Sequence, residues 1–166
     1  MALIPGVKIS GSSILTGIVR GFPNLLDIPS AIFADAVLPY VEPNNPRVVS
    51  LANQLTTPRS MFEWVRDNIE YVPEAVEHFQ RPDETLDRKA GDCEDNAILL
   101  ASLLSAKGYR NRFKVIAWPL VSQMHIYNQI YDGGRWVDAD ASNPDSEYGI
   151  VSAPGSFTVA VFDAIR

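Results

Sequence analysis

Residues 88–100 read Arg-Lys-Ala-Gly-Asp-Cys-Glu-Asp-Asn-Ala-Ile-Leu-Leu and include the only cysteine of the 166-residue chain. Asp92 is the expected N-cap of a helix, because its carboxylate can accept hydrogen bonds from the free N–H groups of the next turn. Asp95 stands where the acid of a capping box stands, although Glu or Gln is more usual there. The apolar pattern that follows predicts a helix from Cys93 to Lys107 that is buried on nearly all sides.

The position of Cys93 at the start of this helix has two opposed effects on its thiol. The positive end of the helix dipole favours the thiolate, which is the nucleophilic form. Three neighbouring carboxylates, those of Asp92, Glu94 and Asp95, disfavour another anion. Helix position alone therefore does not activate Cys93, and a cationic partner is required. Without one, a lone cysteine is most simply a small buried hydrophobe.

The composition sets limits on the class of protein. A length of 166 residues, with 46% apolar and 20% charged residues, predicts one soluble globular domain. A net charge of −6 argues against nucleic acid as the main partner, since phosphate binding requires a basic face. One cysteine excludes an intramolecular disulfide and a cysteine-based zinc site. Residues 1–26 lack a basic start and contain several Gly and Pro residues, so we expect no signal peptide, no membrane span and a cytoplasmic protein.

Helix signals recur before the cysteine. Residues 1–45 are expected to form an irregular N-terminal arm with one short helix at residues 31–37. A cap residue followed by proline opens two further helices, at residues 46–55 and at about residues 59–70. Residues 74–90 are polar and are expected to form a connecting loop or a short helix.

Four segments after the cysteine helix have the composition and alternation of strands. They are residues 112–118, 124–131, 135–141 and 157–162. Gly133-Gly134 lies between the second and the third segment and is a signal for a two-residue hairpin turn.

The two-residue turn determines which side chains of the hairpin meet. It places Tyr127 opposite Asp140 and His125 opposite Ser142, so His125 and Asp140 become diagonal neighbours with Cα atoms about 7–8 Å apart. Asp138 lies one pleat further along its strand. Asp140 is therefore the carboxylate expected to orient His125. A three-residue loop would shift the register and remove this pairing.

A base for Cys93 must be one of two histidines. His78 lies in the polar connecting segment and is expected to be solvated. His125 lies on a predicted strand beside an acid. Cys93, His125 and Asp140 thus have the residue types of a nucleophile, a general base and an orienting carboxylate.

The order and spacing of these motifs resemble the transglutaminase-like superfamily. The resemblance covers roughly residues 58–142 and rests on Gly-Asp-Cys-Glu-Asp-Asn-Ala at 91–97, Lys-Gly-Tyr at 107–109, Met-His at 124–125, and Gly-Arg-Trp-Val-Asp-Ala-Asp-Ala-Ser at 134–142. It implies a papain-like core, in which the cysteine helix packs on an antiparallel sheet. It also implies that Cys93 is the nucleophile, His125 the base and Asp140 the acid.

The Gly-Asp-Cys-Glu-Asp form most resembles the bacterial transglutaminase-like cysteine proteinases, some of which bind calcium. A calcium-dependent variant would use Asp92, Glu94 or Asp95, although three acids at a helix start are more simply explained by capping and solvation. The side chain that the family uses to hold an oxyanion cannot be placed by motif, and Trp64, Tyr71 and Gln80 are candidates by position.

The expected architecture is a single α+β domain over residues 1–166, with the arm at 1–45, the core at 46–142 and a C-terminal extension at 143–166. The expected function is a cysteine hydrolase, namely a peptidase, isopeptidase or amidase that acts through a thioester on a protein or peptide. No cofactor and no membrane partner are expected. Two alternatives stand beside it: a protein-glutamine transglutaminase, and a non-enzymatic binding or assembly module on the same fold.

Overall fold

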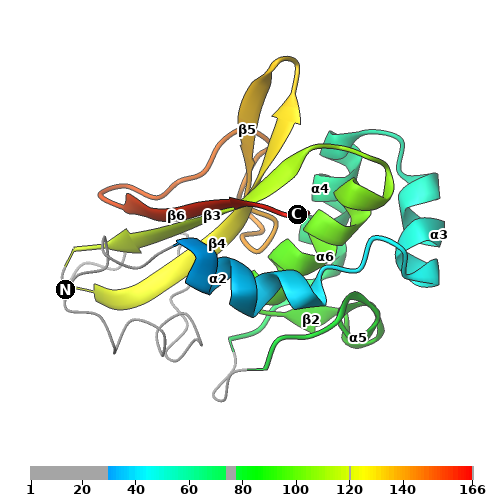
Figure 1. Cartoon of the computed structure of the whole chain (residues 1–166), viewed down its shortest axis with the longest axis horizontal. Coiled ribbons are helices and arrows are strands. Elements are labelled where there is room, and N and C mark those ends of the chain that lie inside the picture. Colours follow the sequence, from blue (N-terminus) through cyan, green and yellow to red (C-terminus); the bar gives the residue numbers. More distant parts are fainter. Residues whose placement is uncertain (1–29, 74–77, 120, 166) are drawn as a thin grey trace.

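The computed structural model describes residues 30–73, 78–119 and 121–165, so the expectation of an irregular arm before residue 30 lies outside the described residues. Helices pack against an antiparallel four-stranded sheet (Figure 1). Helix α6 (Cys93–Ala106) lies at the centre, where it contacts the sheet on one side and the shorter helices on the other. This confirms the predicted α+β class and the packing of the cysteine helix on an antiparallel sheet.

The predicted helices before the cysteine form, with small shifts at their ends, as α2 (Ser30–Val37), α3 (Pro46–Gln54) and α4 (Pro58–Asn68). The 3₁₀ turn η2 (Leu38–Tyr40) was not predicted, and the segment expected to form a loop or a short helix contains α5 (Pro82–Arg88). The side chain of Asn45 accepts the N–H of Arg47 at 3.0 Å and caps α3. Thr57 and Ser60 exchange side-chain and backbone hydrogen bonds in a capping box that starts α4. The cap-then-proline pattern therefore marked both helix starts correctly.

The main sheet has the strand order β5-β4-β3-β6, with antiparallel neighbours throughout. Its strands are β3 (Asn111–Trp118), β4 (Val121–Asp132), β5 (Arg135–Ala139) and β6 (Phe157–Asp163). A separate parallel pair, β1 (Glu70–Tyr71) with β2 (Ala90–Gly91), leads directly into α6.

The register of the hairpin agrees with the prediction near the turn and departs from it further along. Asp132 faces Arg135 across a two-residue turn, and the pairing continues to Asn128 opposite Ala139. Both turn glycines have positive φ, as this tight turn requires. The predicted third strand is too long, because β5 ends at Ala139 and not at Ala141.

The physical reason for the early end of β5 is a local turn. The Oδ1 of Asp140 accepts hydrogen bonds from the backbone N–H and the hydroxyl of Ser142, at 3.2 and 2.7 Å. A side chain that binds the backbone two residues later competes with strand pairing. The predicted pairings of Tyr127 with Asp140 and of His125 with Ser142 therefore do not form, and that part of the register prediction was wrong.

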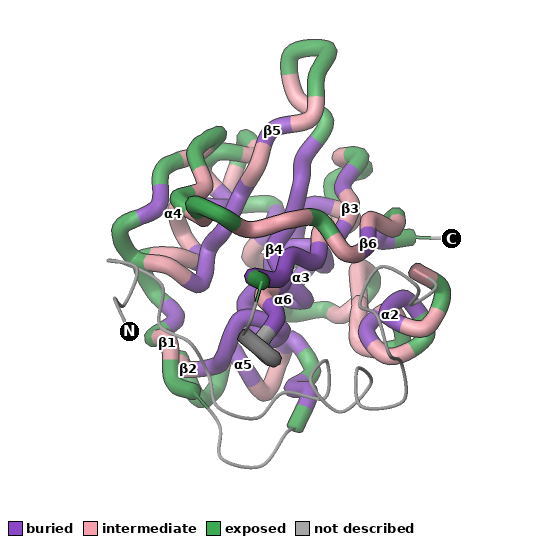
Figure 2. The backbone as a smooth tube through the Cα atoms, turned by 90° about the vertical axis from the view of Figure 1, so that its left-hand side faces the viewer, coloured by how far each residue is buried: buried purple, intermediate pink, exposed green. Residues whose placement is uncertain are grey.

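The core surrounds α6, whose residues from Cys93 to Leu104 are all buried (Figure 2). One face of the sheet packs on this helix through side chains such as Phe113, Val115 and Ile126. By strand alternation, His125 and Tyr127 belong to the opposite face, which we call the outer face. No helix among the described residues is long and apolar enough to cross a bilayer.

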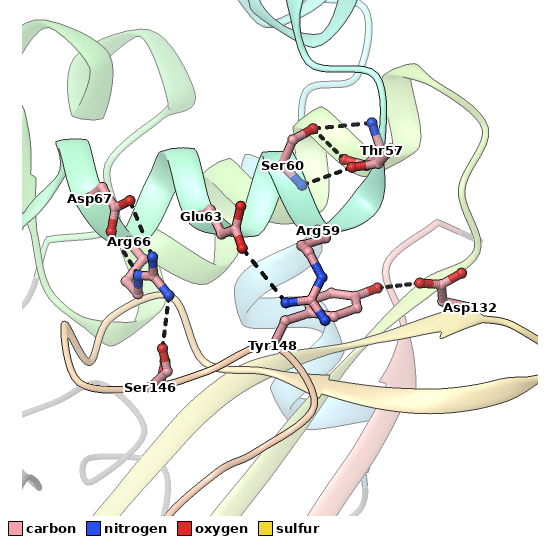
Figure 3. A network of polar contacts seen from close by, with 9 residues as sticks. All are labelled: Thr57, Arg59, Ser60, Glu63, Arg66, Asp67, Asp132, Ser146 and Tyr148. Carbon is pink, nitrogen blue, oxygen red and sulfur yellow. Dashed lines mark hydrogen bonds and ion pairs between the residues drawn. The ribbon is translucent and has the colours of Figure 1, made fainter.

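A polar network fixes the segment that follows Asp140 against α4 (Figure 3). Arg66 donates to the carbonyl of Ser146 at 3.0 Å, and the guanidinium of Arg59 lies 4.8 Å from the centre of the Tyr148 ring. The hydroxyl of Tyr148 donates to Asp132 at 2.9 Å, which ties the same segment to β4. The hydroxyl of Ser146 also donates to the carbonyl of Asp140. The position of Asp140 is thus determined by α4 and β4 together.

Candidate active site

The start of α6 is built as the sequence predicted. The carboxylate of Asp92 accepts the N–H groups of Glu94 and Asp95 at 3.1 and 3.4 Å, and Asp95 completes the capping box by accepting the N–H of Asp92. Gly91 is required here for space, because a Cβ on it would lie 2.6 Å from the Cβ of Asp95. The cap therefore holds Cys93 at the first position of the helix.

The thiol of Cys93 is buried and has two polar neighbours. It donates a hydrogen bond to Oε2 of Glu94 at 2.9 Å, and its sulfur accepts the backbone N–H of Ile126. Burial raises the pKa of the thiol well above its ordinary value, and the charges of Glu94 and Asp92 raise it further. The thiol is therefore neutral in this arrangement, as expected for a cysteine among carboxylates with no cation.

The open edge of β4 explains how a helix start reaches the backbone of Ile126. Pairing between β4 and β5 stops at Asn128 and Ala139. At Ile126 the edge of β4 that faces β5 therefore has no partner strand. The N-terminus of α6 occupies this place, and the N–H of Ile126 lies against the sulfur. His125, the preceding residue of β4, is thus brought to the same end of the sheet.

The partly buried His125 is hydrogen-bonded to the buried Asp140, with Nε2 and Oδ2 2.7 Å apart. Burial by itself would lower the pKa of His125, but the charge and hydrogen bond of Asp140 outweigh it and raise that pKa. Burial would likewise raise the pKa of Asp140, but His125 and the hydrogen bonds from Ser142 lower it. An ionised Asp140 accepts a hydrogen bond from the Nε2–H group of His125, which leaves Nδ1 of the neutral ring as the acceptor.

A cavity of about 290 Å³ opens beside this pair. Its walls are Tyr71, Trp118, His125, Asp140, Ser142, Asn143, Pro144, Asp145, Val151, Ser152 and Ala153. Tyr71 lines the cavity beside His125 and Asp140. Burial, together with the charges of Asp92, Glu94 and Asp140, raises the pKa of Tyr71, so it stays a neutral phenol and a hydrogen-bond donor.

Comparison with known proteins identifies the family. The model of the transglutaminase-like superfamily matches residues 46–141. The chain belongs to the transglutaminase-like superfamily. No curated protein sequence matches the chain. Solved structures share the fold of this transglutaminase-like chain, as their TM-scores show.

A Cytophaga hutchinsonii protein named as a putative cysteine protease gives a TM-score of 0.57 at 21% identity, with 88% of this chain and 53% of that one covered. A Parabacteroides distasonis protein named as a putative protease gives 0.59 at 13% identity, with 86% and 31% covered. EGTA-treated LapG of Legionella pneumophila gives 0.51 at 17% identity, with 91% and 81% covered. The chain thus spans about half the length of the first structure and about a third of the second.

The structure brings the transglutaminase-like motif residues to one end of the sheet in two separate pairs. The Cys93 thiol is hydrogen-bonded to the Glu94 carboxylate, and the His125 ring is hydrogen-bonded to the Asp140 carboxylate. Within the described residues, no hydrogen bond joins Cys93 to His125. A Cys93–His125–Asp140 triad therefore stays a prediction, and Glu94 is the thiol partner that sequence reasoning missed.

The three oxyanion candidates lie in different surroundings. Tyr71 lines the cavity, whereas Trp64 packs against the core cluster that contains Val65 and Leu100. Gln80 is fully buried, and its backbone N–H donates to Asp95 at 2.9 Å. Of these three candidates, Tyr71 is therefore the one that lines the cavity.

Asp138 and Tyr127 lie on the same outer face of the sheet as His125. The ring of Tyr127 lies 5.9 Å from that of His125, tilted by 32°. Asp138 accepts from Gln129 at 2.7 Å and forms a hydrogen bond with Tyr127. Asp138 thus binds the neighbours of His125, while Asp140 binds His125 itself.

The second histidine and the acids at the helix start are explained more simply by solvation and helix capping than by a catalytic or metal-binding role. His78 is exposed, as predicted, and pairs with Glu84 at 3.1 Å. Ligand atoms of Asp92, Cys93 and Glu94 lie within 4.8 Å of one another. Calcium requires six to eight oxygen ligands, but the Asp92 carboxylate here accepts backbone N–H groups and Glu94 accepts the thiol. The arrangement fits helix capping, and calcium dependence stays an untested expectation.

The cavity walls at residues 143–145 and 151–153 were also missed. They belong to the segment after the hairpin, where the sequence has no periodic pattern. The turn signal Asn-Pro-Asp at 143–145 marks a loop there, but nothing in it predicts that the loop folds over His125.

Proposed function

We propose that the protein is a cysteine hydrolase that cleaves peptide or isopeptide amide bonds through a thioester on Cys93. One observation carries the proposal: His125, held by a buried carboxylate at 2.7 Å, borders a cavity, and the next residue of β4, Ile126, contacts the sulfur of the only cysteine. Membership of the transglutaminase-like superfamily supports the same assignment.

The first step requires the thiol to leave Glu94. In this proposal the Cys93 sulfur moves from Glu94 to Nδ1 of His125, the ring nitrogen that does not face Asp140. Nδ1 takes the thiol proton, and Asp140 stabilises the imidazolium through Nε2. The resulting thiolate then has the cationic partner that the acidic surroundings of the helix start do not supply.

The second step is attack of the sulfur on the amide carbonyl. The backbone N–H of Cys93, at the first turn of α6, lacks an intrahelical partner and can donate to the developing oxyanion. The Tyr71 hydroxyl is the side chain that we assign as a second donor. His125 then passes its proton to the leaving amine, and water attacks the thioester to release the acid.

The substrate that we propose is a protein or peptide segment. The cavity combines apolar walls (Trp118, Val151 and Ala153) with polar groups near His125. This composition suits one side chain of a substrate next to the scissile amide. We propose that no metal takes part, and assays with EDTA and with added calcium test this.

The decisive experiment is a substrate profile with matched variants. Fluorescent casein, an ε-lysyl isopeptide and a glutamine peptide with a fluorescent amine separate peptidase, isopeptidase and amine transfer. Cys93→Ala and His125→Ala should each abolish turnover, whereas His78→Ala, which removes the other histidine, should retain it. Turnover that survives Cys93→Ala would refute the proposal, and amine transfer without hydrolysis would make the protein a transglutaminase.

A further inference from the structure

The arginines in the described part of the chain divide into two groups by their partners. Five of those in the described residues pair with carboxylates: Arg47, Arg59, Arg66, Arg81 and Arg88. Three have no carboxylate within ion-pair distance among the described residues, namely Arg110, Arg112 and Arg135. All three lie at the hairpin end of the sheet, although the chain carries a net charge of −6.

Two of these arginines are held by aromatic rings on the outer face. The guanidinium of Arg112 lies 3.9 Å from the centre of the Trp136 ring. That of Arg110 lies 4.9 Å from the Tyr131 ring and 5.6 Å from the Trp136 ring. The two rings contact each other edge to face, with centroids 5.4 Å apart. We call these four residues, Arg110, Arg112, Tyr131 and Trp136, the hairpin patch.

The hairpin patch is both ordered and accessible. Arg112 is fixed by a hydrogen bond from Nε to Gln129 at 2.8 Å, which leaves its two terminal nitrogens for another acceptor. Tyr131 is 39% exposed, among the most exposed large hydrophobic side chains of the described residues. The hairpin stands away from the body of the molecule in both views (Figures 1 and 2). Arg135 lies at its turn, on the opposite face from Trp136 by strand alternation.

Acidic groups near the hairpin patch do not neutralise it. Asp163 faces Arg112 across the β3–β6 pair but lies beyond ion-pair distance. Asp138 is already held by Gln129 and by Lys114, at 2.7 and 3.8 Å. Asp132 accepts the hydroxyl of Tyr148. The two stacked guanidinium groups thus remain available to an outside carboxylate.

We propose that the hairpin patch is a docking surface for an acidic, aromatic-containing segment of a partner protein. A guanidinium offers a planar fork that matches a carboxylate, and stacking on an aromatic ring holds that fork in place before binding. Less side-chain freedom is then lost when the partner binds. Tyr131 and Trp136 add an exposed apolar surface for an aromatic side chain of the same segment.

A nucleic acid fits the hairpin patch less well than an acidic peptide. Affinity for a polyanion comes from neutralising many phosphates along a basic surface. The hairpin offers few cations, and the rest of a chain with net charge −6 would repel an extended phosphate backbone. A short carboxylate-rich segment needs only the guanidinium groups that the patch presents.

The test uses the whole chain labelled with ¹⁵N and a synthetic probe. The probe is a short peptide of glutamate and aspartate with one central phenylalanine, and its control has glutamine and asparagine in their place. The indole N–H signal of Trp136 should shift with the acidic probe and not with the neutral one. The double variant R110Q/R112Q should bind the acidic probe about fivefold to tenfold more weakly.

A second double variant, R47Q/R88Q, is the matched control, because it removes the same charge from two exposed, ion-paired arginines elsewhere. It should bind the probe within about twofold of the wild type. If both double variants bound the acidic probe equally more weakly than the wild type, the loss of affinity would be explained by net charge alone, and the proposal would be overturned. It would also be overturned by an unshifted Trp136 signal, or by tighter binding of a single-stranded oligonucleotide than of the acidic probe.

Discussion

Replacing Asp140 by asparagine tests the proposed role of His125 directly. The amide oxygen of asparagine can still accept from Ser142, so the turn after β5 should remain. Its NH₂ group, however, would face Nε2 of His125 as a donor. The ring would then carry its proton on Nδ1 and present an N–H where the thiol proton must be accepted.

The magnitude follows from the contact that is lost. In a comparable triad the same change reduced turnover by about 10⁴, which corresponds to about 5.5 kcal/mol of transition-state stabilisation. We expect a loss of that order for Asp140→Asn. The folded state also loses a charged hydrogen bond of 2.7 Å in a buried place, so the free energy of unfolding should fall by about 1.5–3 kcal/mol.

Three measurements check this prediction, and Asp138→Asn serves as the matched control. Turnover is measured on whichever substrate the profile identifies. The alkylation rate of Cys93 by iodoacetamide against pH reports its thiolate without a substrate. The ¹⁵N shifts of the imidazole report the tautomer, and His78→Gln assigns the two histidines. Asp138 does not contact His125, so its variant should lose little turnover and keep the tautomer. Equal losses in both variants, or an unchanged tautomer in Asp140→Asn, would refute the reasoning.

The other predictions concern the helix start and the buried pair. Glu94→Gln removes the charge that faces the thiol, so Cys93 should be alkylated faster than in the wild type between about pH 6 and 8. An unchanged rate would mean that burial alone holds the thiol neutral. Gly91→Ala would place a Cβ 2.6 Å from that of Asp95 and open the capping box, so urea denaturation should show a loss of about 1–2 kcal/mol, and a loss within error would contradict the role of the cap. The raised pKa of His125 contributes stability that is complete below about pH 6.5 and is lost as pH rises through the folded value. The lowered pKa of its carboxylate partner contributes stability that is complete above about pH 3.9 and is lost as pH falls. The difference in melting temperature between wild type and His125→Ala should therefore peak between these limits, and a flat difference would argue against the pair.

Short-range signals determined most of the secondary structure from sequence alone. Asn45 and Thr57 cap the helices that they were predicted to cap, since an N-cap acts on N–H groups two or three residues away. The turn at Gly133-Gly134 gave the register of the hairpin, because a two-residue loop admits one pairing next to it. The contact of His125 with Asp140 was reached in the same way, although the strand ends earlier than predicted.

The chemistry of the site depended on contacts that no local pattern contains. Whether the start of α6 can contact Ile126 depends on how far β5 extends, since its early end leaves the edge of β4 open there. The cavity is closed by residues 143–145 and 151–153, whose positions are set by packing on α4 and the sheet.

The same distinction holds for the hairpin patch. The sequence by itself determined the helices, the hairpin and the family motif, because caps, turns and periodicity act over a few residues. Only the tertiary structure decided which arginines find a carboxylate and which, as Arg110 and Arg112 do, stack on Tyr131 and Trp136. These choices depend on strands that meet across the sheet, and side-chain energies there are set by neighbours distant in sequence.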